Sequence, residues 1–179
     1  MSGFWKDFPE LNNELQLVRD EILKHSQSSD AGFEQALTEM VGSGGKMLRP
    51  AFLMLSARFG TYEPQKIRTL AAVIEMLHMA TLVHDDIVDD SRLRRGIETV
   101  QSKYGKDYAV YLGDWLFCQC FMMLSSHDYT RENLQDISKA IMKICMGEIR
   151  QFNFRYNAHM SFKNYLKVIS GKTAALFAM

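Results

Sequence analysis

Apolar residues recur along the chain with the three- to four-residue period of an α-helix. Two segments near the N-terminus show this period first: Leu11, Leu15, Val18 and Ile22, then Phe33, Leu37, Met40 and Val41. Pro50 and Pro64 stand where a proline suits the first turn of a helix, because the N–H that proline lacks would have no helical partner there. This first part of the chain is therefore predicted to be helical.

The longest periodic segment runs from Pro64 to about Asp90. One apolar stripe follows it: Leu70, Val73, Ile74 and Leu77. Two further helices are predicted over residues 105–126 and 131–153. Most of the central part of the chain is thus expected to consist of long helices.

Helix-capping residues and a glycine-rich segment indicate where the predicted helices begin and end. Thr130 suits the N-cap of one helix and Ser161 that of a further helix, since a hydroxyl oxygen can accept the first free N–H groups. The glycine-rich segment 42–50 is interpreted as a loop between two helices, and no convincing strand, hairpin, repeat or linker appears. These features predict an all-α fold, a helical bundle in which residues 1–179 belong to one domain.

Charge excludes one class of partner. The 21 Lys and Arg residues balance the 21 Asp and Glu residues, and no basic patch is interleaved with aromatic residues. A nucleic-acid partner is therefore not expected.

The cysteines and the apolar runs bear on the compartment. Cys118, Cys120 and Cys145 form no CxxC pair and lie within apolar helical patterns, so buried reduced thiols are predicted. The N-terminus does not have the pattern of a signal peptide, and Glu75 and His78 interrupt the best apolar run short of a membrane span. We expect a soluble, cytoplasmic protein without a membrane span.

Residues 84–96, HDDIVDDSRLRRG, concentrate negative charge at the end of an apolar helix. Asp85 and Asp89 are four residues apart, so they lie on one helix face, with Asp86 on its flank. Two carboxylates about 6 Å apart repel by roughly 3 kcal/mol at an effective dielectric near 20. A solvated acidic helix end is the plain alternative, but the helix dipole disfavours anions at this end. A bound hard cation removes both penalties, and Mg²⁺ suits carboxylates that share it with substrate phosphates.

Three cationic elements accompany the carboxylates. Arg94 and Arg95 follow them directly, and Lys46 and Arg49 come from the glycine-rich segment. The third element is Gly171-Lys172-Thr173, which offers an ammonium and a hydroxyl group. Each element alone would more often be solvated surface charge, but together with the carboxylates they favour two diphosphate sites.

At these residues the chain resembles the trans-type isoprenyl diphosphate synthases, the polyprenyl synthase family, and among them the long-chain, heptaprenyl-type members. Four motifs arrive in the family's order: GGKMLRP, HMATLVHDDIVDD, RLRRG and YLKVISGKTAALF. The resemblance extends from about residue 30 to the end and implies an isoprenoid-synthase helical bundle.

The resemblance implies a role for each matching residue. One group would bind isopentenyl diphosphate: Lys46, Arg49, His78 and Arg95. A second group would hold the diphosphate of the allylic primer: Arg94, Lys172 and Thr173. Asp85 and Asp89 would ligate Mg²⁺ with Asp86 in support, and these three aspartates with Lys172 would form the catalytic set. The allylic diphosphate would depart, and the double bond of isopentenyl diphosphate would attack the allylic cation before a proton is lost.

Product length follows from the same resemblance. In the family, bulky aromatic residues four or five positions before the first aspartate stop chain growth early, whereas Thr81 and Ala80 are small here. A product longer than farnesyl diphosphate is predicted, of the kind used for quinone side chains. The family's second aspartate-rich motif is absent from this sequence, which matches the N-terminal half of a family member. The 179-residue chain is therefore predicted to be inactive alone.

Three alternatives remain open at this point. A di-iron bundle protein is suggested by the E-x-x-H spacing of Glu75 and His78, although no second copy is present. A class I terpene cyclase shares the DDxxD motif but needs no second diphosphate pocket. A non-catalytic partner of another prenyl synthase subunit is the third, since family members form dimers, and either a homodimer or a heterodimer is expected.

Overall fold

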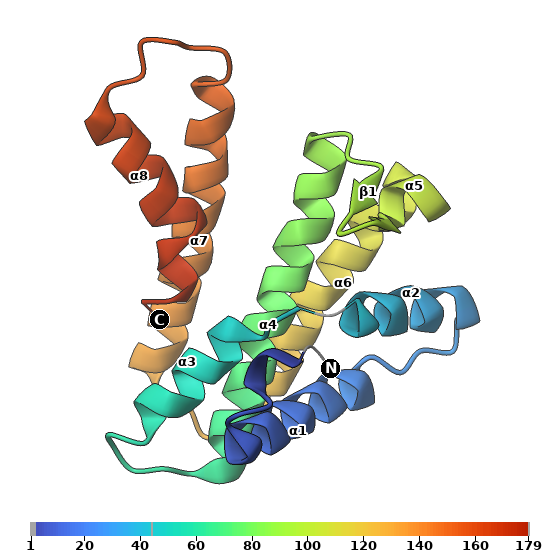
Figure 1. The fold of residues 1–179 in the computed structure, drawn as a ribbon, viewed down its shortest axis with the longest axis vertical. Coiled ribbons are helices and arrows are strands. Elements are labelled where there is room, and N and C mark those ends of the chain that lie inside the picture. The colour runs from blue at the N-terminus through green and yellow to red at the C-terminus, as the bar shows by residue number, and fades with distance from the viewer. Residues whose placement is uncertain (1–2, 44, 179) are drawn as a thin grey trace. The chain divides into compact units, whose positions relative to one another are not determined.

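The computed structural model describes residues 3–43 and 45–178, which form two compact units, Met1–His127 and Asp128–Met179. Gly44, inside the predicted glycine-rich loop, lies outside the described residues. The described residues are mostly helical, so the all-α prediction is confirmed (Figure 1). The prediction that residues 1–179 make one domain stays a prediction.

The first unit contains a short 3₁₀ helix, six α-helices and two short strands among its described residues. In chain order these are η1 (Gly3–Trp5), α1 (Pro9–His25), α2 (Ala31–Gly42), α3 (Leu48–Ala57), α4 (Pro64–Val88), β1 (Leu93–Arg94), β2 (Ile97–Glu98), α5 (Val100–Tyr104) and α6 (Lys106–Ser125). The helical periods predicted over residues 11–22 and 33–41 are confirmed as α1 and α2. The helices predicted over 64–90 and 105–126 are confirmed as α4 and α6, with ends close to those expected.

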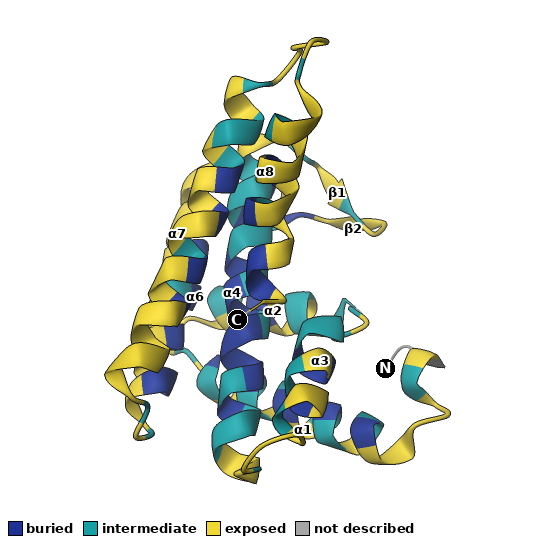
Figure 2. Ribbon diagram, turned by 90° about the vertical axis from the view of Figure 1, so that its left-hand side faces the viewer, coloured by how far each residue is buried: buried dark blue, intermediate teal, exposed yellow. Residues whose placement is uncertain are grey.

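Helix α4 is the centre of this unit. It packs mainly against α6, and α1 and α3 lie against its other sides. Its predicted stripe is only part of a broader buried surface: Ala71, Ala72, Met76 and Ala80 are buried as well (Figure 2). A helix that is apolar on most sides is typical of a bundle interior.

The prediction that the chain contains no hairpin is wrong. Strands β1 and β2 pair antiparallel, with Leu93 opposite Glu98 and Arg94 opposite Ile97. Arg95 and Gly96 form the two-residue turn between them and have φ of 54° and 82°. Positive φ at both central positions is what a tight turn that matches strand twist requires. Strands of two residues are too short to give an alternating pattern, so the sequence carried little sign of them.

The predicted loop at 42–50 is shorter than expected. Helix α2 extends to Gly42 and α3 begins at Leu48, so Arg49 and Pro50 belong to the first turn of α3. Met47, immediately before α3, has a left-handed backbone with φ of 49°. The connection between the helices is therefore five residues long, and Arg49 is presented from a helix.

The second unit consists of α7 (Arg131–Asn153), α8 (Phe162–Lys172) and the 3₁₀ helix η2 (Ala174–Leu176). Both predicted caps are confirmed, because the side chains of Thr130 and Ser161 accept hydrogen bonds from Asn133 N and Asn164 N. Gly147 and Gly171 lie at the crossing of α7 and α8, where the two backbones approach closely.

The cysteine prediction is confirmed in part. All three cysteines are free thiols, but only Cys120 is buried, whereas Cys118 and Cys145 are exposed. Burial raises the pKa of the Cys120 thiol to about 12, so this thiol is unreactive at neutral pH.

By length and composition, helix α4 is long and apolar enough to span a membrane, although a charged and a polar residue were expected to interrupt this run. Core helices of soluble proteins share these properties, and 56% of the most apolar stretch of α4 is buried within the fold.

Candidate functional site

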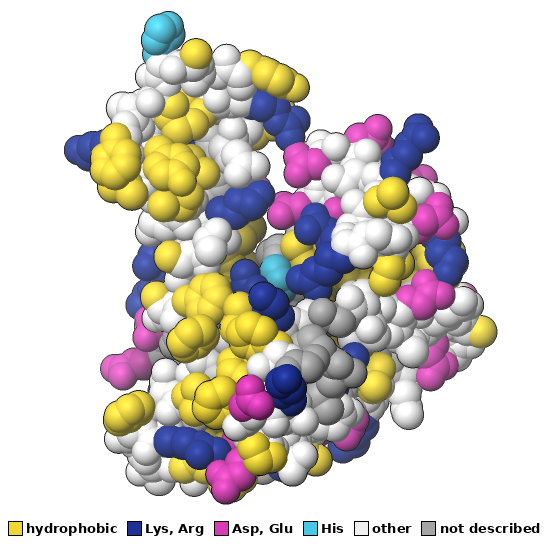
Figure 3. Space-filling view, in the orientation of Figure 1, with side chains coloured by type: hydrophobic (Ala, Val, Ile, Leu, Met, Phe, Trp, Pro, Cys, Tyr) yellow, Lys and Arg dark blue, Asp and Glu magenta, His cyan; other side chains and the backbone are white. Residues whose placement is uncertain are grey.

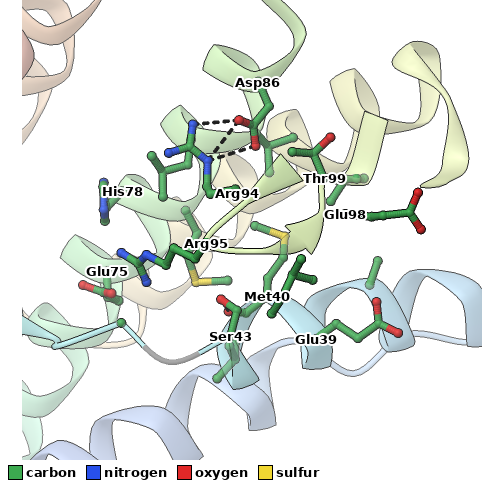
Figure 4. A pocket seen from close by; sticks show the side chains of 18 of the residues that line it. Glu39, Met40, Ser43, Glu75, His78, Asp86, Arg94, Arg95, Glu98 and Thr99 are labelled. Atoms are coloured by element: carbon green, nitrogen blue, oxygen red, sulfur yellow. Dashed lines mark hydrogen bonds and ion pairs between the residues drawn. The ribbon is translucent and has the colours of Figure 1, made fainter. Parts of the chain in front are cut away.

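A cavity of about 110 Å³ lies in the first unit between α2, α4 and the hairpin (Figure 4). Its wall is partly apolar, with Ile22, Met40, Met79, Leu82 and Val83. Its charged and polar residues come from several elements: Arg19, Glu39, Glu75, His78, Asp86, Arg94, Arg95 and Lys103. Three of the residues predicted from sequence to bind diphosphate, His78, Arg94 and Arg95, therefore line one cavity.

Asp86 and Arg94 form a two-pronged ion pair at the edge of this cavity. Arg94 Nη2 donates to Asp86 Oδ1 at 2.7 Å, and Arg94 Nε lies 3.0 Å from Oδ1 and 3.2 Å from Oδ2. Asp86 is only 6% exposed. Its hydrogen bonds with Arg94 raise the pKa of the Arg94 guanidinium above the usual value. Such forked pairs orient both groups strongly. Sequence reasoning assigned these residues to metal and diphosphate, and the structure adds that they bind each other.

The start of α5, directly after the hairpin, is also attached to the end of α4 by neutral groups. The side-chain amide of Gln101 donates to the carbonyl oxygens of Asp86 and Ser91, at 2.8 Å in each case. The hydroxyl of Thr99 donates to Ser91 O at 2.7 Å. These bonds tie the start of α5, directly after the hairpin, to the last turn of α4 and to Ser91 just beyond it.

Asp85 and Asp89 lie one helical turn apart, as predicted, since Asp89 N donates to Asp85 O at 2.8 Å. Asp85 is half-buried and Asp89 is exposed at the C-cap of α4. Acidic and basic side chains gather at this end of α4 and over the hairpin (Figure 3). Among the residues that the structure describes, no group of three or more His, Cys, Asp or Glu side chains converges as a metal site.

Glu75 and His78 line the cavity and lie near two arginines, Arg95 of the lining and Arg49 of α3. Burial raises the pKa of the Glu75 carboxyl, while Arg49, Arg95 and, more weakly, Arg19 lower it. Burial also lowers the pKa of Arg49, whereas the nearby charge of Glu75 raises it. Figure 4 shows Glu75, His78 and Arg95 directed toward one another. Arg49 and Arg95 thus lie close to the half-buried Glu75 carboxyl, and His78 lines the same cavity as Glu75 and Arg95.

His78 is neutral at physiological pH. Burial and, to a lesser extent, Arg49, Arg95 and Arg94 lower its pKa to about 3. The ring therefore offers one N–H donor and one acceptor to a ligand, and carries no charge.

This depressed pKa predicts a pH-dependent stability. Between pH 6.5 and about 3 the unfolded chain protonates His78 and the folded chain does not, so folding stability falls as pH falls through this range. The raised pKa of Glu75 acts in the opposite direction above its usual value. We therefore compare His78→Gln with the wild type, because Glu75 is common to both. From pH 7.5 to pH 5 the variant should gain about 1–2 kcal/mol relative to the wild type.

Thermal unfolding followed by circular dichroism at several pH values measures this difference. His159→Gln, at an exposed position, is the matched control and should follow the wild type. A constant difference between His78→Gln and wild type from pH 7.5 to 5 would contradict the prediction.

Lys46 is exposed on the connection between α2 and α3. Gly45 precedes it, and a side chain there would meet Arg95 Nη1 at 3.3 Å and Glu75 Oε1 at 3.7 Å. The glycine therefore lets the backbone of this connection lie directly against the Glu75 and Arg95 side chains.

Lys172 and Thr173 belong to the second unit, at the end of α8. Lys172 Nζ lies 2.9 Å from Glu148 Oε2 of α7, and both side chains are about 30% exposed. The ammonium also stands at the C-terminal end of its helix, where positive charge is favourable. The predicted allylic group is thus divided along the chain, with Arg94 in the first unit and Lys172 and Thr173 in the second.

Several residues of these sites were not predicted from sequence. Glu75 was considered only as an iron ligand, and Gln101 and Glu148 were given no role. Little in the sequence indicated these roles, because an isolated Glu or Gln within a helical pattern is normally a solvated residue. His84 is a further case: its ring packs over Gly113 and lies 3.3 Å from Asp114 Oδ1, between α4 and α6.

Comparison with known proteins matches residues 30–179 to the family model of the polyprenyl synthetases. The chain is 36% identical over 168 residues to heptaprenyl diphosphate synthase component 2 of Geobacillus stearothermophilus, covering 94% of this chain and 52% of that protein. The chain thus spans about half the length of the curated relatives it matches.

Solved structures give the same result. The geranylgeranyl pyrophosphate synthase of Lactobacillus brevis superposes with a TM-score of 0.93 at 36% identity, over 97% of this chain and 54% of that one. A polyprenyl synthase of Caulobacter crescentus, solved with calcium and isoprenyl diphosphate, has a TM-score of 0.87 at 33% identity. The match covers 93% of this chain and 51% of that one.

Proposed function

Because the chain belongs to the polyprenyl synthetase family, we propose that it provides the isopentenyl diphosphate site, and part of the allylic site, of a prenyl diphosphate synthase. The observation that best supports this proposal is that Glu75, His78 and Arg95 line one cavity, with Arg49 close enough to Glu75 to lower the pKa of its carboxyl. A neutral imidazole and two guanidinium groups suit a diphosphate.

The residues present suit Mg²⁺. Asp85 and Asp89 supply oxygen ligands one helical turn apart, and they are too few to enclose a metal ion. Magnesium is commonly held in this way, by one or two carboxylates, with water and substrate phosphate oxygens completing its shell. When bound, the ion would neutralise charge on the departing diphosphate of the allylic substrate.

The chain's own residues then have distinct tasks. Arg49, Arg95 and Lys46 would bind the diphosphate of isopentenyl diphosphate, and His78 would offer it a neutral hydrogen bond. Asp86 would keep Arg94 beside the aspartates, where its guanidinium can meet a second diphosphate. Lys172 and Thr173, in the second unit, are proposed as diphosphate-binding residues because they match the family's motif. Condensation requires no side-chain nucleophile, since the double bond of isopentenyl diphosphate attacks the allylic cation.

Calorimetric titration of the purified chain with isopentenyl diphosphate tests this proposal. Binding without Mg²⁺ is expected, because Arg49, Arg95 and Lys46 offer positive charge to the diphosphate directly. Failure to bind either isopentenyl diphosphate or inorganic pyrophosphate would refute it. Transfer of labelled isopentenyl units by the 179-residue chain alone is expected to be undetectable, and sustained incorporation would overturn that prediction.

Ala80 provides a test of product length. It is fully buried in α4, while Thr81 is only half-buried and donates to His78 O at 2.8 Å. In an active complete synthase containing this chain, Ala80→Phe should shorten the main product by several isoprene units. A long-chain product, such as one for a quinone side chain, is proposed for the unmodified protein. Chromatography of the products measures the change, Ala80→Val serves as the milder control, and an unchanged product distribution would contradict the proposal.

A partner subunit is proposed on a separate observation. The relatives from Geobacillus stearothermophilus and Bacillus subtilis are named as component 2 of a heptaprenyl diphosphate synthase, which implies another component. A second polypeptide that co-purifies at fixed stoichiometry and restores transfer would support a heterodimer. A self-associated chain that is active without one would favour a homodimer instead.

A further inference from the structure

The N-terminal aromatic residues contact the connection that carries Lys46. The indole Nε1 of Trp5 donates a hydrogen bond to Lys46 O at 2.6 Å, across a sequence separation of 41 residues. The ammonium of the same lysine lies 4.8 Å from the centre of the Phe4 ring. Phe4 and Trp5 are themselves in edge-to-face contact, with ring centroids 4.9 Å apart. Lys46 is therefore held through both its backbone and its side chain.

The connection needs such support because it has little of its own. Residues 45–47 have no helix or strand, and Met47 adopts a left-handed backbone. Ordering each residue of such a segment costs about 1–2 kcal/mol of conformational entropy. A distant hydrogen bond that fixes the backbone in advance spares a ligand part of that cost.

The aromatic segment stands outside the region that defines the family. The family model begins at residue 30, whereas Phe4 and Trp5 lie well before it. Its contact with Lys46 therefore joins a segment before the matched region to a predicted site residue within it.

We propose that Phe4 and Trp5 are positioning residues for Lys46: Trp5 fixes its backbone, and Phe4 holds its ammonium over a neutral ring until a diphosphate binds. This inference rests on the proposed function. An exposed cation–π contact is weaker than a charge-assisted bond to phosphate. The ammonium therefore transfers to the diphosphate while the backbone stays anchored by Trp5.

A double-mutant cycle tests the proposal, with isopentenyl diphosphate as the calorimetric ligand of the purified chain. Trp5→Phe removes the donor and keeps an aromatic ring, so affinity should fall about fivefold, as for the loss of one hydrogen bond. In the Lys46→Met background the same change should have no effect, because the positioned ammonium is gone. Trp115→Phe, whose ring packs edge-to-face on Phe33, is the matched control and should bind like the wild type.

A spectroscopic measurement gives an independent readout. The chain has two tryptophans, so Trp115→Phe leaves Trp5 as the only one. Addition of inorganic pyrophosphate should change its emission, because the ammonium leaves the neighbouring Phe4 ring. An unchanged emission under saturating pyrophosphate would overturn the proposal.

The outcomes separate this inference from the proposed function. If the wild type binds isopentenyl diphosphate and Trp5→Phe binds equally well, the inference is wrong and the proposed function stands. Equal losses with and without Lys46 would mean that Trp5 acts on folding only, which also overturns it. If the wild type binds neither ligand, both proposals fail.

Discussion

Replacing Arg95 with glutamine should weaken isopentenyl diphosphate binding about 100-fold. Arg95 presents its guanidinium from a tight turn to a cavity that also holds Glu75 and His78. Charge-assisted hydrogen bonds contribute about 1.5–3 kcal/mol each, and loss of about 2.7 kcal/mol is a factor of 100. Glutamine is close in length but lacks the charge and the forked donors.

Arg92→Gln is the matched control for this change. Arg92 lies just before the same hairpin, is exposed, and is not among the residues that line the cavity. Its replacement should change affinity less than about twofold, as expected for a solvated charge. Calorimetric titration of both variants decides the matter, and an affinity of Arg95→Gln within threefold of the wild type would contradict the assignment.

Replacing Gly171 with alanine should destabilise the second unit by about 2–4 kcal/mol. An added Cβ would lie 2.7 Å from Lys143 O and 2.9 Å from Gly147 Cα, which are backbone atoms that cannot rotate away. In an open helix the same change would gain up to about 1 kcal/mol. The close crossing reverses the sign, because α7 and α8 must separate to admit the methyl group.

Hydrogen exchange localises this effect. Amides of α7 and α8 should lose protection in Gly171→Ala, while those of α4 and α6 keep theirs. Gly42→Ala is the matched control, since a Cβ there meets nothing within 4 Å. A Gly171→Ala chain with wild-type protection in α7 would show that the crossing tolerates a side chain.

Local rules were sufficient for the helices and their caps. The apolar period marked α4 and α7, and Thr130 and Ser161 cap the helices predicted for them. These features depend on neighbours within four residues, so they can be read directly from the chain. The chemical classes in the site were also visible, because paired aspartates followed by arginines are adjacent in sequence.

The sequence did not show which side chains of the site contact one another. The sequence suggested that Arg94 binds a substrate, whereas in the fold its guanidinium donates hydrogen bonds to Asp86. The role of Glu75 as the carboxylate among Arg49 and Arg95 depends on three elements meeting, as does the contact of Trp5 with Lys46. The hairpin escaped prediction because its strands are two residues long.

The sequence by itself determined the helical class, the caps at Thr130 and Ser161 and the inventory of carboxylates, guanidinium groups and the imidazole, because periodicity and capping act over one or two turns. Only the tertiary structure decided which of these groups face one another. Burial then set their behaviour: it keeps His78 neutral, raises the pKa of Glu75 and leaves Asp86 held by Arg94. Desolvation and charge proximity arise from residues far apart in the chain, and no local pattern encodes them.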